Sequence, residues 1–511
     1  MINKFLLKNI NILTLFFISL ALTFYLMLPV IISGTKGIFF TLDPDAHYIG
    51  NAISYIKSHQ ISYINHPATP TILAYVLALT PFRLYSKLIL HANFINWYIL
   101  HPEIIYLYIR VLQCILFGLG LFIFSLSSYR ITRSLILSAF SMLALFIFGF
   151  FTDIALHIRS ETTSFLIISI WLLEFVSFIK SKKISQNYLL AAISGLAIAN
   201  KFTNIFYLIA TLSLIPFIKV TSRKKKLIVS LFSLFIGLLS FIFFTWPIRG
   251  KYYQILQYIL NFFPQSGVSA NKNTLLDLPI YLHSLYSLFL NEFWSSMTVI
   301  LTFLLLIYLF IKKKHKIPVS VYSFACTMLF GILTFARYPL NYYQLTHFVG
   351  VVFVLHILLM QFPKYLRILF LLIIFFISIN HLANYYPQVS YAINQSKNLD
   401  NFISRHPAKI GSIWERGDAK DFALLWGNSW SGASYSEDLK RLRPNLLFEI
   451  YFQQNYIGDK RDIFTICWDK FYLQHNYLKK FINKYKGHTF TYNSIPGTDT
   501  MYVIERNKCE S

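Results

Sequence analysis

Long apolar runs separated by short basic clusters constrain this chain more than any other feature of its sequence. Residues 104–127 and 227–247, for example, are each long enough to cross a bilayer, because a helix needs about 20 apolar residues to do so. Of the 511 residues, 56% are hydrophobic and only 13% are charged. Soluble domains carry about 25% charged residues, so this chain has too little polar surface for a water-soluble globule. We therefore predict a polytopic α-helical membrane protein.

The formal net charge of +25 would indicate nucleic-acid binding in a soluble protein. Here the lysines and arginines stand in short clusters between apolar runs, where they meet anionic lipid headgroups. We expect membrane lipid to be a partner of this chain, and no nucleic acid.

The basic clusters also predict a topology, because short cytoplasmic loops are enriched in Lys and Arg. Lys4 and Lys8 place the N-terminus in the cytoplasm. Arg130 and Arg133 stay on that side only if one intervening apolar stretch does not cross, and we predict that residues 68–82, which prolines bound, are re-entrant or interfacial. The other runs give eleven crossings: 10–32, 104–127, 134–152, 161–179, 187–200, 202–219, 227–247, 293–312, 318–336, 345–362 and 366–383.

This topology divides the chain into a transmembrane domain over residues 1–383 and an extracytoplasmic α/β domain over residues 384–511. The first outer loop spans residues 33–103 and holds the re-entrant helix, and a second outer loop spans residues 248–292. We place the protein in the plasma (inner) membrane, with its C-terminal domain outside the cytoplasm. In that domain, alternation predicts strands at 409–414, 462–467, 489–493 and 500–505, and a helix at 477–485.

None of the four cysteines has the spacing of a metal site. Cys114 and Cys326 lie in apolar runs, where a cysteine acts as a small hydrophobic residue. Cys467 and Cys509 both lie in the C-terminal domain and could form a disulfide if that side of the membrane is oxidising.

Several polar residues fall at the outer ends of the predicted crossings, and each has a plain structural alternative. The carboxylates Asp43 and Asp45 could cap a helix, and the negative charge of Glu161 could stabilise the N-terminus of a helix. Arg159 could extend to the interface, whereas Lys201 lies inside a 30-residue apolar stretch and needs an anionic partner or water. The full set of candidate site residues is Asp43, Asp45, Tyr48, His66, Arg159, Glu161, Lys201, Arg249 and Arg337.

All of these positions except Arg249 lie in four motifs that resemble the GT-C superfamily of membrane glycosyltransferases. The branch is the one that contains the protein O-mannosyltransferases and the lipid A aminoarabinose transferase. Ser160 stands where that branch usually has proline, and the last motif is only loosely similar. In order along residues 1–380, the motifs are Asp43-x-Asp45-x-x-Tyr48 with His66-Pro67-x-x-Pro70, Arg159-Ser160-Glu161, Gly195-Leu196-Ala197-Ile198-Ala199-Asn200-Lys201-Phe202-Thr203 and Arg337-Tyr338-Pro339-Leu340.

The resemblance implies an enzyme that transfers a sugar from a polyprenyl-phosphate donor to a glycan, lipid or protein acceptor on the outer face. In that picture Asp43, or else Asp45, is the general base, and Glu161 orients the acceptor or assists the base. Lys201, with Arg249 and Arg337, binds the departing phosphate. A single base with direct displacement predicts inversion at the sugar carbon. The nearby carboxylates could hold a divalent metal, although nothing in the sequence requires one or any other cofactor.

Three other functions remain open from the sequence, and one of them is a receptor or structural role for the C-terminal domain. A transporter of lipid-linked sugars should show paired hydropathy repeats and helices broken near mid-membrane, and the sequence has no internal repeat. A polysaccharide polymerase or ligase should carry a late outer loop rich in Arg and His, and residues 248–292 are sparse in both.

Overall fold

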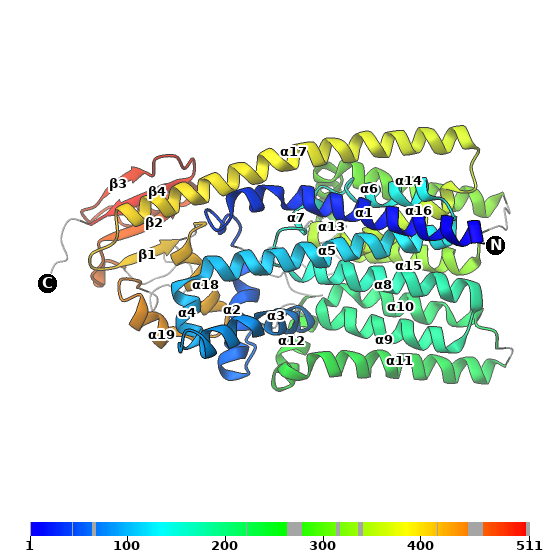
Figure 1. Cartoon of the computed structure of the whole chain (residues 1–511), viewed down its shortest axis with the longest axis horizontal. Coiled ribbons are helices and arrows are strands. Elements are labelled where there is room, and N and C mark those ends of the chain that lie inside the picture. Colours follow the sequence, from blue (N-terminus) through cyan, green and yellow to red (C-terminus); the bar gives the residue numbers. More distant parts are fainter. Residues whose placement is uncertain are drawn as a thin grey trace. The chain divides into compact units, whose positions relative to one another are not determined.

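The apolar runs fold as helices in the computed structural model of the chain (Figure 1). The structure describes residues 2–42, 44–63, 68–220, 222–262, 278–312, 317–335, 341–415, 417–447 and 463–506. The chain divides into two compact units. Unit 1 comprises Met1–Met27, Ile64–Thr71 and Gln113–Tyr385, and unit 2 comprises Leu28–Tyr63, Ile72–Leu112 and Tyr386–Ser511.

Seven helices of the described chain are long and apolar enough to cross a membrane, which fits a multi-pass helical membrane protein. They are α1 (Ile2–Ser33), α5 (Pro102–Thr132), α8 (Ser160–Ser181), α11 (Arg223–Thr245), α14 (Phe293–Ile311), α16 (Asn341–Leu359) and α17 (Lys364–Arg405). Four shorter helices lie in the remaining predicted crossings: α6 (Leu135–Leu145), α9 (Ile184–Asn200), α10 (Ile205–Ser213) and α15 (Val319–Phe335). Each of the eleven predicted segments therefore contains a helix.

The other helices are short or lie outside those segments. They are α2 (Asp45–Ser58), α3 (Thr69–Leu88), α4 (Phe94–Leu100), α7 (Phe150–Asp153), α12 (Tyr252–Phe262), α13 (Leu278–Asn291), α18 (Lys420–Trp430), α19 (Ser436–Leu442) and α21 (His475–Lys484). Four 3-10 turns complete the set: η1 (Phe202–Asn204), η2 (Ile215–Phe217), η3 (Trp246–Lys251) and η4 (Ile463–Thr465).

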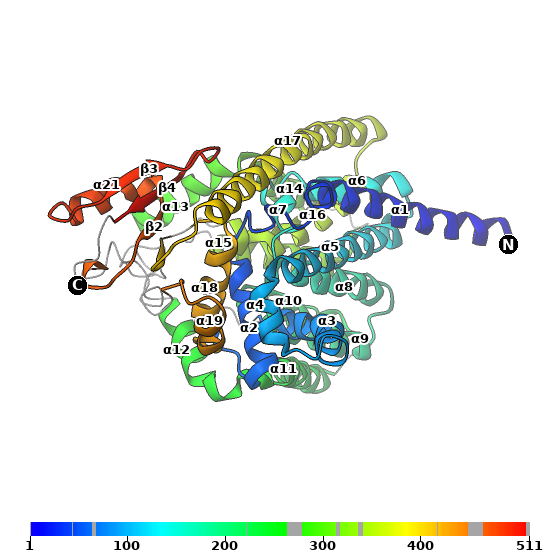
Figure 2. The same ribbon diagram turned by 60° about the vertical axis from the view of Figure 1, so that its left-hand side comes forward.

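Within unit 1, α16 is the central helix. In the most apolar stretch of α16, 94% of the residues are buried, whereas in that of α11 only 17% are buried. A helix that is hydrophobic on every side belongs in the middle of a bundle, and one that is buried on a single side belongs at its edge. Helices α8, α9 and α11 lie side by side, as Figures 1 and 2 show.

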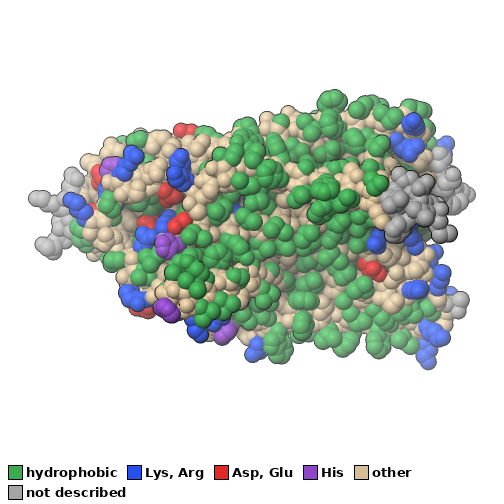
Figure 3. Space-filling model, in the orientation of Figure 1, with side chains coloured by type: hydrophobic (Ala, Val, Ile, Leu, Met, Phe, Trp, Pro, Cys, Tyr) green, Lys and Arg blue, Asp and Glu red, His purple; other side chains and the backbone are tan. Residues whose placement is uncertain are grey.

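Hydrophobic side chains cover most of the helical surface seen in Figure 3, whereas Lys and Arg lie toward both ends of that view. The exposed basic residues that follow α8 and begin α11 are Lys182, Lys183, Arg223, Lys224 and Lys225. An apolar surface that ends in a basic fringe is the pattern expected of helices that a bilayer solvates.

The C-terminal part of unit 2 contains a four-stranded sheet with the order β1-β2-β4-β3. Its strands are β1 (Ser412–Glu415), β2 (Lys470–Gln474), β3 (Thr491–Ser494) and β4 (Met501–Glu505). β1 pairs with β2 in parallel, and the other two pairs are antiparallel. The predicted strands at 409–414, 489–493 and 500–505 therefore have counterparts in the sheet, and the predicted helix at 477–485 lies within α21 apart from its last residue.

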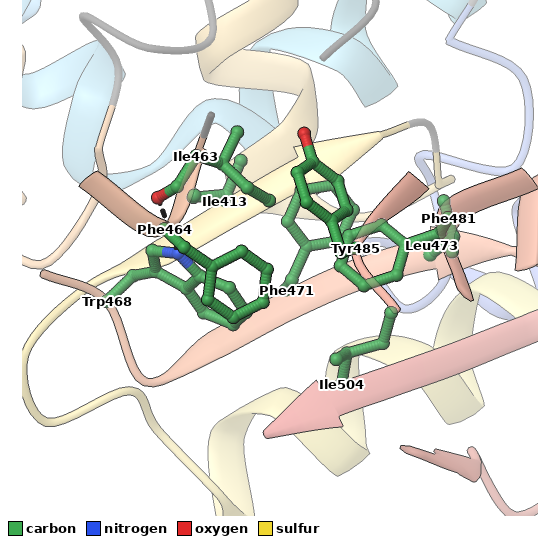
Figure 4. Packing of buried hydrophobic residues seen from close by; sticks show 9 residues of the cluster. All are labelled: Ile413, Ile463, Phe464, Trp468, Phe471, Leu473, Phe481, Tyr485 and Ile504. Carbon is green, nitrogen blue, oxygen red and sulfur yellow. Dashed lines mark hydrogen bonds between the residues drawn. The ribbon is translucent and has the colours of Figure 1, made fainter. Parts of the chain in front are cut away.

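The predicted strand at 462–467 is wrong: residues Ile463–Thr465 form the 3-10 turn η4 instead. The reason is local, because Ile463 and Phe464 are both buried in the core beside the sheet (Figure 4). A strand would point these neighbours to opposite faces. The turn is held by Trp468, whose Nε1 donates to the Ile463 carbonyl oxygen at 3.0 Å.

Cys467, next to this turn, is disulfide-bonded. Cys509, its candidate partner in the sequence, lies outside the described residues, and Cys114 and Cys326 are free thiols.

Helices α2 and α18 of unit 2 cross at two glycines. A Cβ atom added to Gly50 would lie 2.2 Å from the carbonyl oxygen of Gly427. The crossing is also tied by Asn51, whose Nδ2 donates to the Trp430 carbonyl oxygen at 3.1 Å. Two helix backbones can approach this closely only where neither carries a side chain at the contact.

Gly50→Ala should therefore destabilise unit 2. The added methyl group meets backbone atoms that cannot rotate away, and overpacking of this kind costs about 1–3 kcal/mol. The measurement is the thermal unfolding midpoint of the purified full chain, followed by tryptophan fluorescence. Gly487→Ala is the matched control, because a Cβ there meets nothing within 4 Å. Equal midpoints for the two variants would contradict the close crossing.

Candidate functional site

A break in the helical backbone of unit 1 brings polar groups into an otherwise apolar bundle. Helix α9 ends at Asn200, and Lys201 is extended, with φ −157° and ψ 126°, before the turn η1 begins. The broken end is capped by Asn204, whose Nδ2 donates to the carbonyl oxygen of Ala197 at 2.9 Å. Such a break frees backbone groups that must find partners inside the bundle.

Asn200 supplies many of these partners and connects three segments of the chain. Its Nδ2 donates to the Ser160 carbonyl oxygen at 2.7 Å and to the Ser164 hydroxyl at 2.9 Å. Its Oδ1 accepts from the Thr71 hydroxyl at 2.6 Å, and its carbonyl oxygen accepts from the Ala68 amide at 3.2 Å. Residues 68–71, 160–164 and 200, which are far apart in sequence, therefore meet at one side chain.

Lys201 forms a buried ion pair with Glu161, and we call this pair the Glu161–Lys201 centre. The Lys201 Nζ lies 2.6 Å from Glu161 Oε1, and the side chains are only 1% and 7% exposed, respectively. The same Nζ donates to the Tyr342 carbonyl oxygen at 2.8 Å. It also lies 4.8 Å and 5.3 Å from the ring centroids of Tyr342 and Tyr343, which is within cation–π range.

A second cation, Arg159, lies beside this centre. Its Nη2 lies 2.7 Å from Nδ1 of His157, and its guanidinium lies 5.2 Å from the ring centroid of Phe150. Because a guanidinium can only donate, His157 accepts at Nδ1 and carries its proton on Nε2. Burial raises the pKa of the nearby Asp153 carboxyl, and the positive charge of Arg159 opposes that rise.

The arrangement can bind an anion and hold it beside a carboxylate. Lys201 and Arg159 contribute two positive charges, and the carboxyl groups of Glu161 and Asp153 lie near them. Fixed cations in a poorly hydrated site stabilise developing negative charge well, because they need no reorganisation when the charge appears.

Asp45 also forms a buried ion pair, in this case within unit 2. Its Oδ2 lies 2.7 Å from Arg110 Nη2, and both side chains are fully buried. The same nitrogen donates to the Ile38 carbonyl oxygen at 3.1 Å and to the Thr41 hydroxyl at 3.0 Å, and the guanidinium lies over the Phe40 ring. Arg110 thus joins the segment after α1 to the start of α2.

This geometry favours a structural role for Asp45 over the role of a general base. A base needs access to the acceptor hydroxyl, and Asp45 is 0% exposed. Tyr48, a predicted substrate residue, is 2% exposed and packs against Tyr63. Asp43, the preferred base, lies outside the described residues.

Asp45→Asn should lower the free energy of unfolding by about 3–5 kcal/mol, because it leaves a buried guanidinium without its counter-charge. The thermal midpoint of the full chain measures this loss. In Asp45→Leu/Arg110→Met both charges are gone, so this double variant should be more stable than Asp45→Asn. A double variant that is less stable than Asp45→Asn would contradict the structural role.

His47, two residues further, is enclosed by aromatic rings of unit 2. Its ring centroid lies 4.2 Å from that of Trp430, 5.5 Å from that of Trp426 and 5.8 Å from that of Tyr63. Burial lowers the pKa of the imidazole from 6.5 to about 3. The folded protein therefore keeps this histidine neutral over the whole physiological range.

This depressed pKa should make unit 2 less stable in mild acid. Between pH 6.5 and pH 3, His47 binds a proton in the unfolded chain but not in the folded chain. The contribution of His47 to the free energy of unfolding is therefore fully present above pH 6.5 and is lost as the pH falls. The loss at pH 5 is about 2 kcal/mol, at 1.36 kcal/mol per pH unit. In thermal melts at pH 7 and pH 5, His47→Phe should show a smaller difference than wild type. His406→Phe, at an exposed histidine of the same unit, should behave like wild type.

Unit 2 also contains a charged cavity of about 460 Å³. Lys420 Nζ lies 2.9 Å from Glu103 Oε2, its amide donates to Asp400 at 3.1 Å, and Arg443 lies 3.8 Å from Asp421. Burial raises the pKa of the Asp421 carboxyl, against the opposing charges of Arg443 and Lys420. The charged residues of its lining are Lys36, Glu103, Lys397, Asp400, Lys420, Asp421 and Arg443.

Arg249 is not brought to the Glu161–Lys201 centre in the described part of the chain. Arg249 is exposed and lies over the ring of Trp246, 4.9 Å from its centroid, as an interfacial anchor does. His66 and Arg337 lie outside the described residues, as does Asp43. Within the described residues, no group of three or more His, Cys, Asp or Glu could hold a metal ion.

Sequence reasoning missed two residues that organise these sites. Arg110 lies inside the apolar run 104–127, and a charge in such a run is itself the signal of a buried partner. Asn200 stands next to Lys201 in the recognised motif, but its role as a junction depends on contacts that no local pattern encodes. No protein-family model matches the chain, and no curated protein matches it.

Proposed function

We propose that this chain is an inverting glycosyltransferase that moves a sugar from a polyprenyl-phosphate donor to an acceptor hydroxyl on the outer face of the membrane. One observation carries the proposal: the segments around residues 68–71, 159–161 and 200–201 meet within hydrogen-bond distance in unit 1. These segments hold or adjoin three of the motifs that resemble membrane glycosyltransferases. Their meeting point gathers buried polar and charged groups in an apolar bundle, and a phosphate at headgroup depth would need cations.

In this reaction, Asp43 takes the proton of the acceptor hydroxyl, and the acceptor oxygen attacks the anomeric carbon of the sugar. The bond from that carbon to the phosphate oxygen breaks, and polyprenyl phosphate leaves with the electron pair. Lys201 and Arg159 stabilise the charge that grows on the phosphate, and Glu161 holds Lys201 in place. A positioned base contributes about 10²–10⁴-fold, and direct displacement inverts the sugar carbon.

The topology belongs to the same proposal. Eleven crossings, with the N-terminus in the cytoplasm, place residues 384–511 outside. The disulfide at Cys467 supports this orientation. The charged cavity of unit 2 is our candidate binding site for the polar acceptor, because its volume falls in the usual range of ligand pockets, roughly 300–1,000 Å³. Its lining carries both charge signs, which suits a hydrophilic glycan or headgroup.

A transporter of lipid-linked sugars is the second candidate, and one specific feature favours it. Transporters bind substrate where a helix is interrupted, and α9 is interrupted at the buried Lys201. A transporter moves the donor across the membrane without consuming the sugar, so the two functions leave different lipid products.

The test is mass spectrometry of polyprenyl-phosphate lipids from cells that lack the protein, complemented with wild type, Asp43→Asn or Glu161→Gln. We expect one lipid-linked sugar to accumulate in the deletion strain and in both variants, with activity at least 100-fold below wild type for Asp43→Asn, from the usual contribution of a base, roughly 10²-fold or more. The control is Glu437→Gln, at an exposed carboxylate, which should restore the wild-type lipid pool. Immunoblots show that each variant is made.

Identical lipid pools in all strains would contradict the proposal. Purified protein in vesicles separates the two candidates. A transferase releases polyprenyl phosphate when donor and acceptor are on the same side. A transporter instead only moves intact donor between leaflets.

A further inference from the structure

A second cavity, of about 310 Å³, lies in unit 1 where α5 and α8 end. Three cations line it: Arg130 from the last turn of α5, Arg133 directly after that helix, and Lys180 from the last turn of α8. The rest of the lining is largely apolar and consists of Ile12, Leu126, Tyr129, Val176 and Ser177. We call this cavity the basic pocket.

The backbone brings the three cations together. Arg133 adopts a positive φ of 57°, and its amide donates to the Tyr129 carbonyl oxygen at 2.9 Å, which ends α5 and turns the chain back. Lys180 Nζ donates to the Arg130 carbonyl oxygen at 2.8 Å. An ammonium has three donors, so Lys180 keeps donor capacity for a further acceptor.

The charge of the basic pocket is not balanced by the described part of the protein. No carboxylate there lies within 4 Å of Arg130, Arg133 or Lys180. Glu174, on α8, interacts with Arg130 only at longer range. Helix dipoles favour cations at helix C-termini, which accounts for their positions in sequence. Helix dipoles do not account for three cations that line the same basic pocket.

The walls of the basic pocket are fixed by packing. Val176 is fully buried, and Tyr129 is 6% exposed and accepts a hydrogen bond from Asn11 Nδ2 of α1 at 3.0 Å. An anion bound here would meet both the cations and apolar lining side chains such as Ile12 and Leu126. A free inorganic anion gains nothing from these apolar side chains, whereas a lipid, with its chains attached to the phosphate, does.

We propose that the basic pocket binds the phosphate of an anionic phospholipid whose acyl chains lie along α1, α5 and α8. In the predicted topology this end of the helices faces the cytoplasm, where clusters of Lys and Arg recognise anionic headgroups. The proposal does not depend on the glycosyltransferase function, because the residues of the basic pocket take no part in that reaction.

The experiment is native mass spectrometry of the purified full chain, titrated with dioleoyl phosphatidylglycerol or with dioleoyl phosphatidylcholine. Wild type should retain one phosphatidylglycerol in preference to phosphatidylcholine. Arg133→Gln/Lys180→Gln should bind phosphatidylglycerol about 30-fold more weakly, which is about 2 kcal/mol at 1.4 kcal/mol per factor of ten. Arg133→Lys should retain the lipid, because it keeps the charge.

The matched control is Lys224→Gln/Lys225→Gln, which removes the same charge from exposed residues outside the basic pocket. It should bind phosphatidylglycerol like wild type. A thermal melt of each variant verifies folding. Equal affinity for both lipids, or equal loss in the control variant, would overturn the proposal. So would displacement of the lipid by millimolar inorganic phosphate alone, because that result assigns the site to a free anion.

Discussion

A lysine inside an apolar bundle must have a counter-charge, and the pairing of Lys201 with Glu161 meets that requirement in unit 1. The two side chains are nearly inaccessible, so loss of either would leave the other charge buried and unpaired, at a cost of several kcal/mol. The helix break at Asn200 follows from the same constraint. A continuous helix through this position would bury the lysine among apolar neighbours, whereas the extended residue directs its amine to Glu161 and the Tyr342 carbonyl oxygen.

The two buried ion pairs of the described chain have different surroundings, and this difference separates their roles. Arg110 is surrounded by acceptors of its own unit, with Asp45, Ile38 and Thr41 all bonded to one nitrogen. Such a network fixes a fold. Lys201 is bonded to Glu161 and to the Tyr342 carbonyl oxygen, and a second cation, Arg159, lies close by. We therefore assign an architectural role to Asp45, whereas in the proposed function Glu161 holds Lys201 in place.

The helices were predictable because membrane-spanning segments are recognised by their length and apolar composition, and a helix was found in each predicted crossing. The sheet was largely predictable from alternation. The prediction of a strand at 462–467 failed because the neighbours Ile463 and Phe464 are buried in the same core. The alternation of apolar and polar residues cannot reveal this. The candidate site was partly predictable, since Glu161 and Lys201 stood out as charges beside apolar runs. Thr71, Tyr342 and Asn200 did not, because their roles arise only when distant segments meet.

The contact of Gly50 with Gly427 also has a consequence for biosynthesis. The two glycines belong to one unit, yet all of residues 113–385 are made between them. At a translation rate of about 5–20 residues per second, α2 waits roughly 20–75 s for α18 to be synthesised. During that interval His47 and its aromatic neighbours lack Trp426 and Trp430. The nascent first loop therefore presents an unpaired apolar face, and it is a natural substrate for chaperones on the side of the membrane where unit 2 folds.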